Sequence, residues 1–172
     1  VRLEFVSGPT AAAYVEQQKV LQAKNAEESA QKEIKEKNRE ENKQKARDLI
    51  PILLDEVLAG NSGNIGKISV SNKLCFSADD SYDDYFHQNF GKKLVSKDET
   101  AAYCGIFDAG PTIRVMIFAG TKSGVDAGSI AREISTILGG SGGGDAKFAQ
   151  GGGKDTSKKE QAIAKAKSMI LG

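Results

Sequence analysis

The run GGSGGGDAKFAQGGGKD, residues 139–155, is the most informative part of this chain. Its eight glycines form two blocks on either side of the segment DAKFAQ. Glycine at this density lets the backbone approach a ligand or another backbone closely and present its N–H groups. The run carries Phe148 near its centre, has little serine and lies between two amphipathic segments. It is therefore predicted to form a shaped backbone surface and not a flexible linker.

Glycine-rich runs often bind nucleotides, but the spacing here excludes the two common nucleotide loops. The pattern G-x-x-x-x-G-K-[ST] fails because Phe148 stands where its first glycine is required and Asp155 follows Lys154. The pattern G-x-G-x-x-G fails because the run follows a helical segment and Asp145 interrupts the glycine spacing. No ATP or dinucleotide is therefore expected to bind to this run.

Short elements of different kinds flank the glycine run from residue 65 onward, which is typical of a small mixed α/β domain. Strands are expected where apolar residues fill short runs, and helices where apolar residues recur every three or four positions. Asp126 is expected to cap a helix, and Ser157 with Glu160 to form a capping box on the last helix. The predicted strands are 67–77 (one or two strands), 100–107 and 112–119, and the predicted helices are 81–97, 126–138 and a last one that begins near Ser157.

The segment before this domain, residues 11–64, is predicted to be an extended helical arm. Good helix formers continue without glycine or proline to Arg47. Residues 35–45 hold eight charged residues and no apolar one, so the arm is either a solvated rod there or a hairpin that folds back. Pro51 either kinks the helix or starts a new one, and GNSG at 60–63 ends it. The sparse apolar stripe, which needs a partner, consists of Val20, Ala23, Ala26, Ala30 and Ile34.

The composition excludes several classes of protein. Charged residues make up 27% of the chain, but the formal net charge is only +1, so nucleic acid must be bound by a local patch if at all. Cys75 and Cys104 lie in apolar runs with no metal-binding spacing, so buried free thiols in a reducing compartment are expected. No apolar stretch reaches about 18 residues and no leader is recognisable, which predicts neither a membrane span nor secretion. The chain begins at Val1 inside a strand-like segment and is expected to be a piece of a longer polypeptide.

The pattern GGxGGGxxxxAQGGGK followed by a helix resembles the DHH-associated glycine-rich domain at the C-terminus of alanyl-tRNA synthetases, in an archaeal-like form. RLEFVSG at residues 2–8 is similar to the end of that family's editing module, and the order of elements agrees over nearly the whole chain. The resemblance implies an α+β fold, with an extended helical arm followed by a small mixed α/β globular domain. Its parts are the tail of the editing module at 1–10, a helical dimerisation subdomain at 11–64 and a glycine-rich globular tRNA-binding subdomain at 65–172.

The same resemblance implies what the chain binds. The expected partners are tRNA(Ala), contacted at its elbow, and a second copy of the chain, in the cytoplasm, with neither DNA nor a membrane. ATP, Mg and Zn are implied only for the upstream domains of the parent alanine–tRNA ligase, so no catalytic residue, metal or cofactor is expected here. The residues expected to bind tRNA are Gly142, Gly143, Gly144, Lys147, Phe148, Gln150, Gly151, Gly152, Gly153, Lys154, Lys158 and Arg132. The residues expected in the dimer contact are Val20, Ile34, Leu49, Ile50, Leu53, Leu54 and Val57.

Several side chains of kinds that often catalyse or bind metals have simpler explanations. His87 is the only histidine and has no cysteine near it, so it is expected on a helix surface or at the edge of the core and not on zinc. Asp79, Asp80, Asp83 and Asp84 precede a helix, where capping and the helix dipole account for them better than a magnesium site does. No serine or cysteine has a neighbouring base that would make it a nucleophile.

Two other interpretations stay open. The arm and the glycine run can serve protein–protein packing alone, which would make the chain a purely structural module. The accessory domain of a DHH-type phosphoesterase shares the glycine pattern, although RLEFVSG argues against it. Within the run, Asp145 and Ala146 replace a basic residue and a proline of the commoner family pattern. At that point the contact with tRNA is expected to depend on shape and stacking more than on charge.

Overall fold

The computed structural model describes residues 9–172, with side chains from residue 16 onward. It contains two compact units, one up to Asn42 and the other from Lys43 to Gly172, and each is described by itself. The division expected after residue 64 is therefore displaced, because apolar residues between 46 and 57 belong to the core of the second unit. The strand expected at residues 2–6, in the tail of the editing module, lies outside the described residues.

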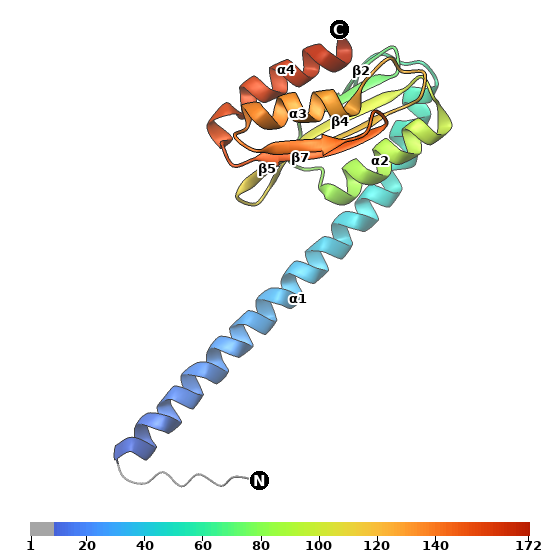
Figure 1. The fold of residues 1–172 in the computed structure, drawn as a ribbon. Coiled ribbons are helices and arrows are strands. Elements are labelled where there is room, and N and C mark those ends of the chain that lie inside the picture. The colour runs from blue at the N-terminus through green and yellow to red at the C-terminus, as the bar shows by residue number, and fades with distance from the viewer. Residues whose placement is uncertain (1–8) are drawn as a thin grey trace. The chain divides into compact units, whose positions relative to one another are not determined.

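Helix α1 spans Pro9–Leu58 (Figure 1). Its residues up to Asn42 belong to the first unit, and its residues from Lys43 belong to the second. Residues 35–45 are helical throughout, so the hairpin alternative is wrong. All described side chains from 16 to 42 are exposed, as expected for a helix with so few apolar residues. Pro51 lies inside the helix without ending it. Gly60, with a φ of +84°, lies just past the end, where a left-handed residue commonly terminates a helix.

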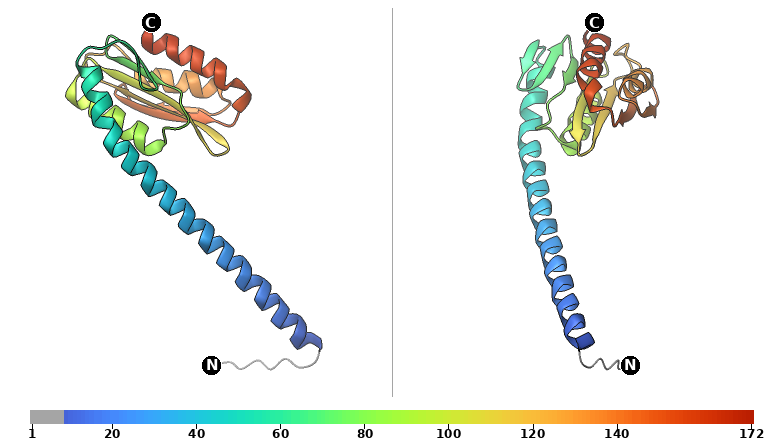
Figure 2. Two further views of the ribbon diagram at one scale, coloured as in Figure 1. Left: turned by 180° about the vertical axis from the view of Figure 1, so that it is seen from behind. Right: turned by 90° about the vertical axis from the view of Figure 1, so that its left-hand side faces the viewer.

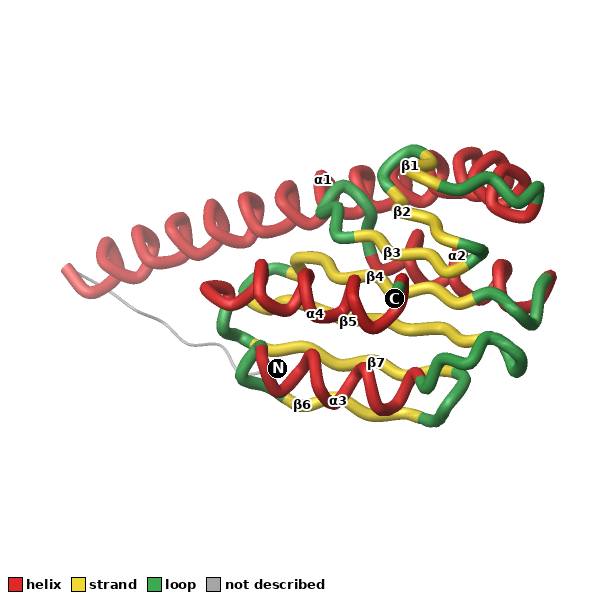
Figure 3. Tube along the Cα trace, turned by 90° about the horizontal axis from the view of Figure 1, so that it is seen from above, coloured by secondary structure: helices red, strands yellow, loops and turns green. Residues whose placement is uncertain are grey.

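The second unit is built on a seven-stranded sheet in the order β1-β2-β3-β4-β5-β7-β6 (Figure 3). Neighbouring strands are antiparallel, except β3 and β4, which are parallel. Asn72 and Lys73, both with positive φ, form the turn between β2 and β3. The strands are β1 (Gly63–Ile65), β2 (Ile68–Ser71), β3 (Leu74–Ser77), β4 (Ala102–Ala109), β5 (Thr112–Ala119), β6 (Ser141–Gly144) and β7 (Phe148–Gly153).

Helices cover both faces of this sheet (Figure 2). The helices that follow α1 are α2 (Asp84–Lys97), α3 (Ala127–Ile137) and α4 (Lys159–Leu171). One core lies between the sheet and α2 with the last turns of α1, and the other between the sheet and α3 with α4. Because side chains alternate along a strand, Met116 and Phe118 of β5 enter the first core while Val115 and Ile117 enter the second. The expected strands, helices and α+β class are confirmed.

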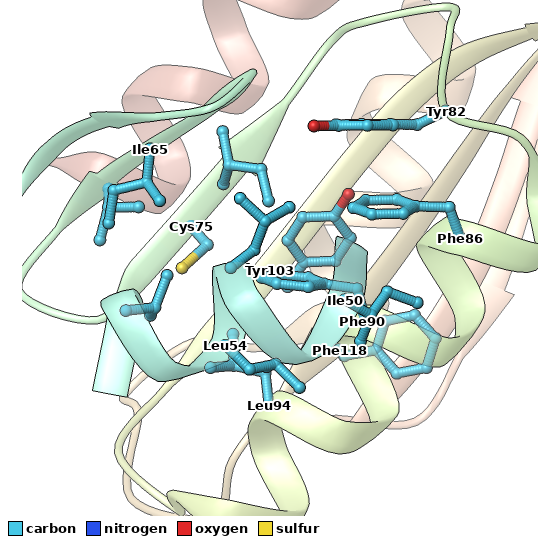
Figure 4. Close-up of a cluster of buried hydrophobic side chains, with 14 of the residues drawn as sticks. Ile50, Leu54, Ile65, Cys75, Tyr82, Phe86, Phe90, Leu94, Tyr103 and Phe118 are labelled. Carbon is cyan, nitrogen blue, oxygen red and sulfur yellow. The ribbon is translucent and has the colours of Figure 1, made fainter. Parts of the chain in front are cut away.

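The first core contains most of the residues that were expected in a dimer contact. Ile50, Leu53, Leu54 and Val57 are each at most 4% exposed, and Leu49 packs against the same cluster. Figure 4 shows Ile50 and Leu54 among aromatic side chains of the sheet and α2. The apolar face of this segment is therefore buried within one chain. Of the expected set, only Val20 and Ile34 are exposed, at 62% and 60%.

The two acidic caps and the capping box have different outcomes. Asp126 accepts a hydrogen bond from the Ser129 backbone N–H at 2.7 Å, which confirms its predicted role, and Asp83 accepts one from Phe86 at 3.0 Å. The capping box at Ser157 is wrong. A 3-10 turn, Thr156–Lys158, precedes α4, and the Ser157 hydroxyl donates to the Asp155 carboxylate instead.

The single histidine lies in the middle of the first core, so its predicted place on a helix surface or core edge is wrong. His87 is 0% exposed, and its ring stacks on Phe107 with centroids 4.1 Å apart. Its Nδ1 lies 2.5 Å from the Tyr103 hydroxyl. Gly105 makes room for the ring, since a Cβ there would lie 2.3 Å from Nδ1. His87 is thus a packed core residue whose Nδ1 has a partner on β4, while its Nε2 is buried without a hydrogen-bond partner in the described part of the chain.

Candidate functional site

The glycine run folds into a hairpin of two strands at the edge of the sheet. Strand β7 pairs with β5, so that Ala149 lies opposite Ile117, and β6 pairs with β7, so that Gly142 lies opposite Gly151. We call these two strands, residues 141–144 and 148–153, the glycine platform. The sequence predicts a shaped backbone surface here, and the surface is a pair of strands with very few side chains.

The glycines allow helix α3 to lie directly on the backbone of the platform. A Cβ on Gly142 would lie 2.4 Å from the carbonyl oxygen of Ala131, and a Cβ on Gly153 would lie 2.0 Å from that of Leu138. Real Cβ atoms do not come so close to a backbone oxygen, and a helix backbone cannot move aside cheaply. One face of the platform is therefore fixed by close contact with α3.

The other face of the platform is hollowed and lies open beside strand β5. Because Gln150 lies opposite both Met116 and Gly143, these residues share the face that carries α2. A hollow of about 420 Å³ is lined there by Arg114, Val115, Met116, Ser141, Gly142, Gly143, Gln150 and Gly151. A second hollow of about 500 Å³ shares Arg114 and Ser141 with the first and includes Lys154. The platform thus offers bare peptide groups beside two cationic side chains, Arg114 and Lys154.

Arg114 is the cation that lines both hollows. Its Nη1 donates to the Asp84 carboxylate at 2.5 Å, and the two side chains are 46% and 51% exposed. Lys154 directly follows β7 and is exposed. A guanidinium and an ammonium at the rim of a polar hollow are suited to bind phosphate groups.

The turn between β6 and β7 explains the acidic residue at position 145. The Asp145 carboxylate accepts hydrogen bonds from the backbone N–H groups of Lys147 and Phe148, at 2.7 and 2.8 Å. These bonds, the one from Phe148 first, lower the pKa of the Asp145 carboxyl. Asp145 therefore shapes the hairpin turn, and its charge is neutralised in part by the turn itself.

The platform collects most, but not all, of the residues expected to bind tRNA. Lys147 lies exposed in the hairpin turn, while Lys158 lies in the turn before α4 and pairs with Asp155 at 3.2 Å. Arg132 lies on α3, which covers the opposite face of the sheet from the hollows. Phe148 is only half-exposed, because its ring packs on Phe118 at 4.8 Å. The platform itself contains Gly142, Gly143, Gly144, Phe148, Gln150, Gly151, Gly152 and Gly153.

Four residues that line the first hollow are not in the set expected to bind tRNA. They are Arg114, Val115, Met116 and Ser141, which lie there together with Gln150 and the glycines. A signal for Arg114 exists in the sequence, since it is a charged residue within the apolar strand TIRVMIFA and must point away from one core. Its position beside the glycine run depends on the pairing of β5 with β7, which the sequence does not reveal.

The acidic residues before α2 bind other side chains of the same unit. Lys159, only 17% exposed, donates to the carboxylates of Asp80 and Asp108 at 2.7 and 2.8 Å, and Lys67 contacts Asp79 at 3.0 Å. Among the residues that the structure describes, no group of three or more His, Cys, Asp or Glu side chains could hold a metal ion. No described helix is apolar enough over a sufficient length to cross a membrane.

These features define a class of domain, in which helices cover both faces of a mixed sheet and a glycine hairpin exposes its backbone at one edge. Residues 71–171 match the model of the DHHA1 domain, and the chain belongs to this family. The matched region contains β4, β5 and the whole glycine platform.

Named relatives agree with this assignment. All of this chain aligns with the alanine–tRNA ligases of Nitrosopumilus maritimus, at 67% identity, and Cenarchaeum symbiosum, at 45% identity, and it spans 19% of the length of each. The crystal structure of the C-Ala domain from Aquifex aeolicus alanyl-tRNA synthetase has a similar fold, with a TM-score of 0.50 and 24% identity. That similarity covers 62% of this chain and 99% of the other. The resemblance to alanyl-tRNA synthetases is confirmed.

Proposed function

We propose that this chain is the part of an alanine–tRNA ligase that binds tRNA(Ala) at its elbow and joins two subunits. The observation that carries the tRNA half of this proposal is the glycine platform, a bare backbone surface with Arg114 and Lys154 at its rim, in a chain related to alanine–tRNA ligases. Aminoacylation and editing, with their ATP, Mg and Zn, belong to other parts of the polypeptide in the cytoplasm.

The chemistry of the platform suits RNA in a particular way. Structured RNA is recognised largely by shape, by contacts to phosphate and ribose, and by stacking on bases that are not covered by a neighbour. The elbow of a tRNA is an outer corner that can approach a flat surface. Gly143 and Gly152 present peptide planes without side chains, while the two cations reach the phosphates. The affinity for tRNA is therefore expected to depend more on the fit of the RNA to the platform than on its charge.

Placing a large side chain on the platform tests this function directly. In Gly143→Leu the Cβ meets no atom within 4 Å, so the leucine enters the hollow from a position that has room for a side chain. We expect affinity for a tRNA(Ala) transcript to fall on the order of tenfold. In the unchanged chain, the logarithm of the association constant should fall linearly with the logarithm of the salt concentration. The slope should be about −0.7 to −0.9 for each phosphate that the protein neutralises.

The matched control places the same side chain on the opposite side of the unit. Gln161→Leu adds a leucine to an exposed position on α4 and should leave tRNA affinity unchanged. Equal binding by Gly143→Leu and the unchanged chain would show that tRNA does not use the platform. An absence of binding by the unchanged chain at low salt would refute the tRNA proposal altogether.

The dimer half of the proposal is supported by the exposed stripe on α1. Val20 and Ile34 are fourteen positions apart, two heptads, and so lie on one side of the helix with Ala23 and Ala30 between them. Exposed apolar side chains on a long polar helix favour pairing with a second helix of the same kind. Glu27 takes the heptad position midway between Val20 and Ile34, which limits the stability of such a seam.

Replacing both Val20 and Ile34 with serine is expected to weaken self-association on the order of tenfold, because apolar area buried in the dimer is lost. Sedimentation equilibrium of the chain over a range of concentrations measures this. Leu21→Ser is the control, since Leu21 is 51% exposed on the same helix but lies off the heptad seam. Self-association that is insensitive to the double change would move the dimer contact away from this stripe.

A further inference from the structure

Arg114 is both a rim residue of the glycine platform and a partner of an acidic side chain. It lines the two hollows, and its Nη1 lies 2.5 Å from the Asp84 Oδ2. The cation that lines both hollows is therefore held by a carboxylate. A phosphate that binds Arg114 through both Nη atoms competes with Asp84 for Nη1.

Asp84 is placed so that it can release Arg114 without losing its own stabilisation. It is the first residue of α2, where the helix dipole favours a negative charge. Both side chains of the pair are about half exposed, so their ion pair is weak and exchanges readily. Arginine binds a phosphate through two parallel N–H bonds as well as it binds a carboxylate.

We infer that Asp84 is a positioning residue that sets the selectivity of the glycine platform, an inference that rests on the proposed binding of tRNA. Asp84 keeps Arg114 at the rim and repels anions that approach without fitting the platform. An RNA phosphate takes the guanidinium only when the rest of the RNA also fits the hollow, because the other contacts then offset the loss of the ion pair. Asp84 thus weakens binding of the correct ligand slightly and binding of unsuited anions more.

The test is a cycle of Asp84→Asn and Arg114→Ala, with affinity measured for a tRNA(Ala) transcript and for a single-stranded RNA of the same length. Asp84→Asn should bind the tRNA about threefold more tightly and the single strand by a larger factor, so that selectivity falls. In the Arg114→Ala background, the change at Asp84 should give no gain. Arg114→Ala alone should also reduce the salt slope by about 0.7–0.9, the value for one phosphate.

A matched control removes the same charge from the opposite face of the sheet. Glu133 on α3 pairs with Lys165 on α4 at 2.8 Å, with exposures of 46% and 45% that resemble those of the Asp84 pair. Glu133→Gln therefore changes net charge and frees a cation equally, but on the face of the sheet opposite the first hollow. It should leave both affinities and their ratio unchanged.

The outcomes separate this inference from the function on which it rests. If tRNA binds the unchanged chain and Asp84→Asn binds no more tightly, the role of Asp84 is refuted while the platform function stands. A gain from Asp84→Asn that persists without Arg114 also refutes it, because the effect is then general repulsion. If only Asp84→Asn binds, the role of Asp84 is supported, and if neither binds at low salt, both proposals fail.

Discussion

Replacing Gly152 with alanine is expected to lower the free energy of unfolding of the second unit by about 4 kcal/mol. Gly152 has a φ of +153°, a conformation that residues with a side chain rarely adopt, and a Cβ there would lie 2.0 Å from the Ile113 carbonyl oxygen. This oxygen belongs to the backbone of β5 and cannot rotate away. Alanine must therefore both strain its own backbone and push β7 from β5, where Arg114 lies opposite Gly152.

The control for this prediction lies on the neighbouring strand. Gly143→Ala adds the same methyl group to the platform, but its Cβ meets no atom within 4 Å, and Gly143 is not in the left-handed region. Its effect should stay within about 0.5 kcal/mol. Urea denaturation followed by near-ultraviolet circular dichroism, which reports the packed aromatic core, measures both variants. Equal stabilities of the two would show that the platform tolerates side chains on either strand.

The contrast between these glycines shows what a sequence can reveal about such a run. Strand β5 was predictable because apolar residues fill its short run, and the helix after Asp126 because its cap and apolar spacing agree. Strands β6 and β7 give no such pattern, since glycine has a low strand propensity and no side chain to alternate. Their conformation follows from pairing with β5 and from the close approach of α3. Neither the strand pairing nor the approach of α3 can be predicted from the sequence of the run itself.

The apolar residues at the end of α1 were assigned to the wrong partner for a similar reason. The segment LIPILLDEVL is apolar on more than one side of its helix, which correctly indicates that it is covered. Whether the cover is a second copy of the chain or a sheet formed further along the same chain depends on tertiary structure. Ile50 and Leu54 pack with Phe86 and Tyr103, which follow them by more than 30 positions.

The candidate site shows how the same limits act on function. The glycine run was expected to form a shaped backbone surface, and it builds the two strands of the glycine platform. The cations expected there were Lys147, Lys154 and Lys158, in or near the run in sequence, and Arg132 on the preceding helix. The structure adds Arg114, which comes from another strand and lines both hollows, and Asp84, which binds Arg114 from a helix. The charged residues beside a surface made of backbone come from neighbouring strands. Their distance from the glycine run in sequence is therefore a poor guide to which residues they are.

Lowering the pH from 7 to 5 is expected to destabilise the second unit by about 2 kcal/mol through His87 alone. Burial lowers the pKa of His87 from 6.5 to about 4, although the Tyr82 backbone carbonyl and the charges of Asp80 and Asp79 act in the opposite direction. Between these two values the unfolded chain binds a proton and the folded chain does not. Stability is therefore complete above pH 6.5 and is lost as the pH falls toward 4.

The loss of stability between pH 6.5 and 4 is assigned to His87 because the chain has a single histidine. The Lys73 ammonium and Thr100 lower the pKa of Asp98 to about 2, so the stability that Asp98 contributes is lost only below the ordinary aspartate pKa of about 3.9. Urea denaturation at pH 7, 6 and 5 should show the slope in the unchanged chain and a flat profile in His87→Phe. That variant is expected to be less stable at pH 7, because the Tyr103 hydroxyl loses its partner at 2.5 Å, but the slope is the decisive quantity. A slope that survives the replacement would mean that another group, and not His87, causes the loss of stability between pH 7 and 5.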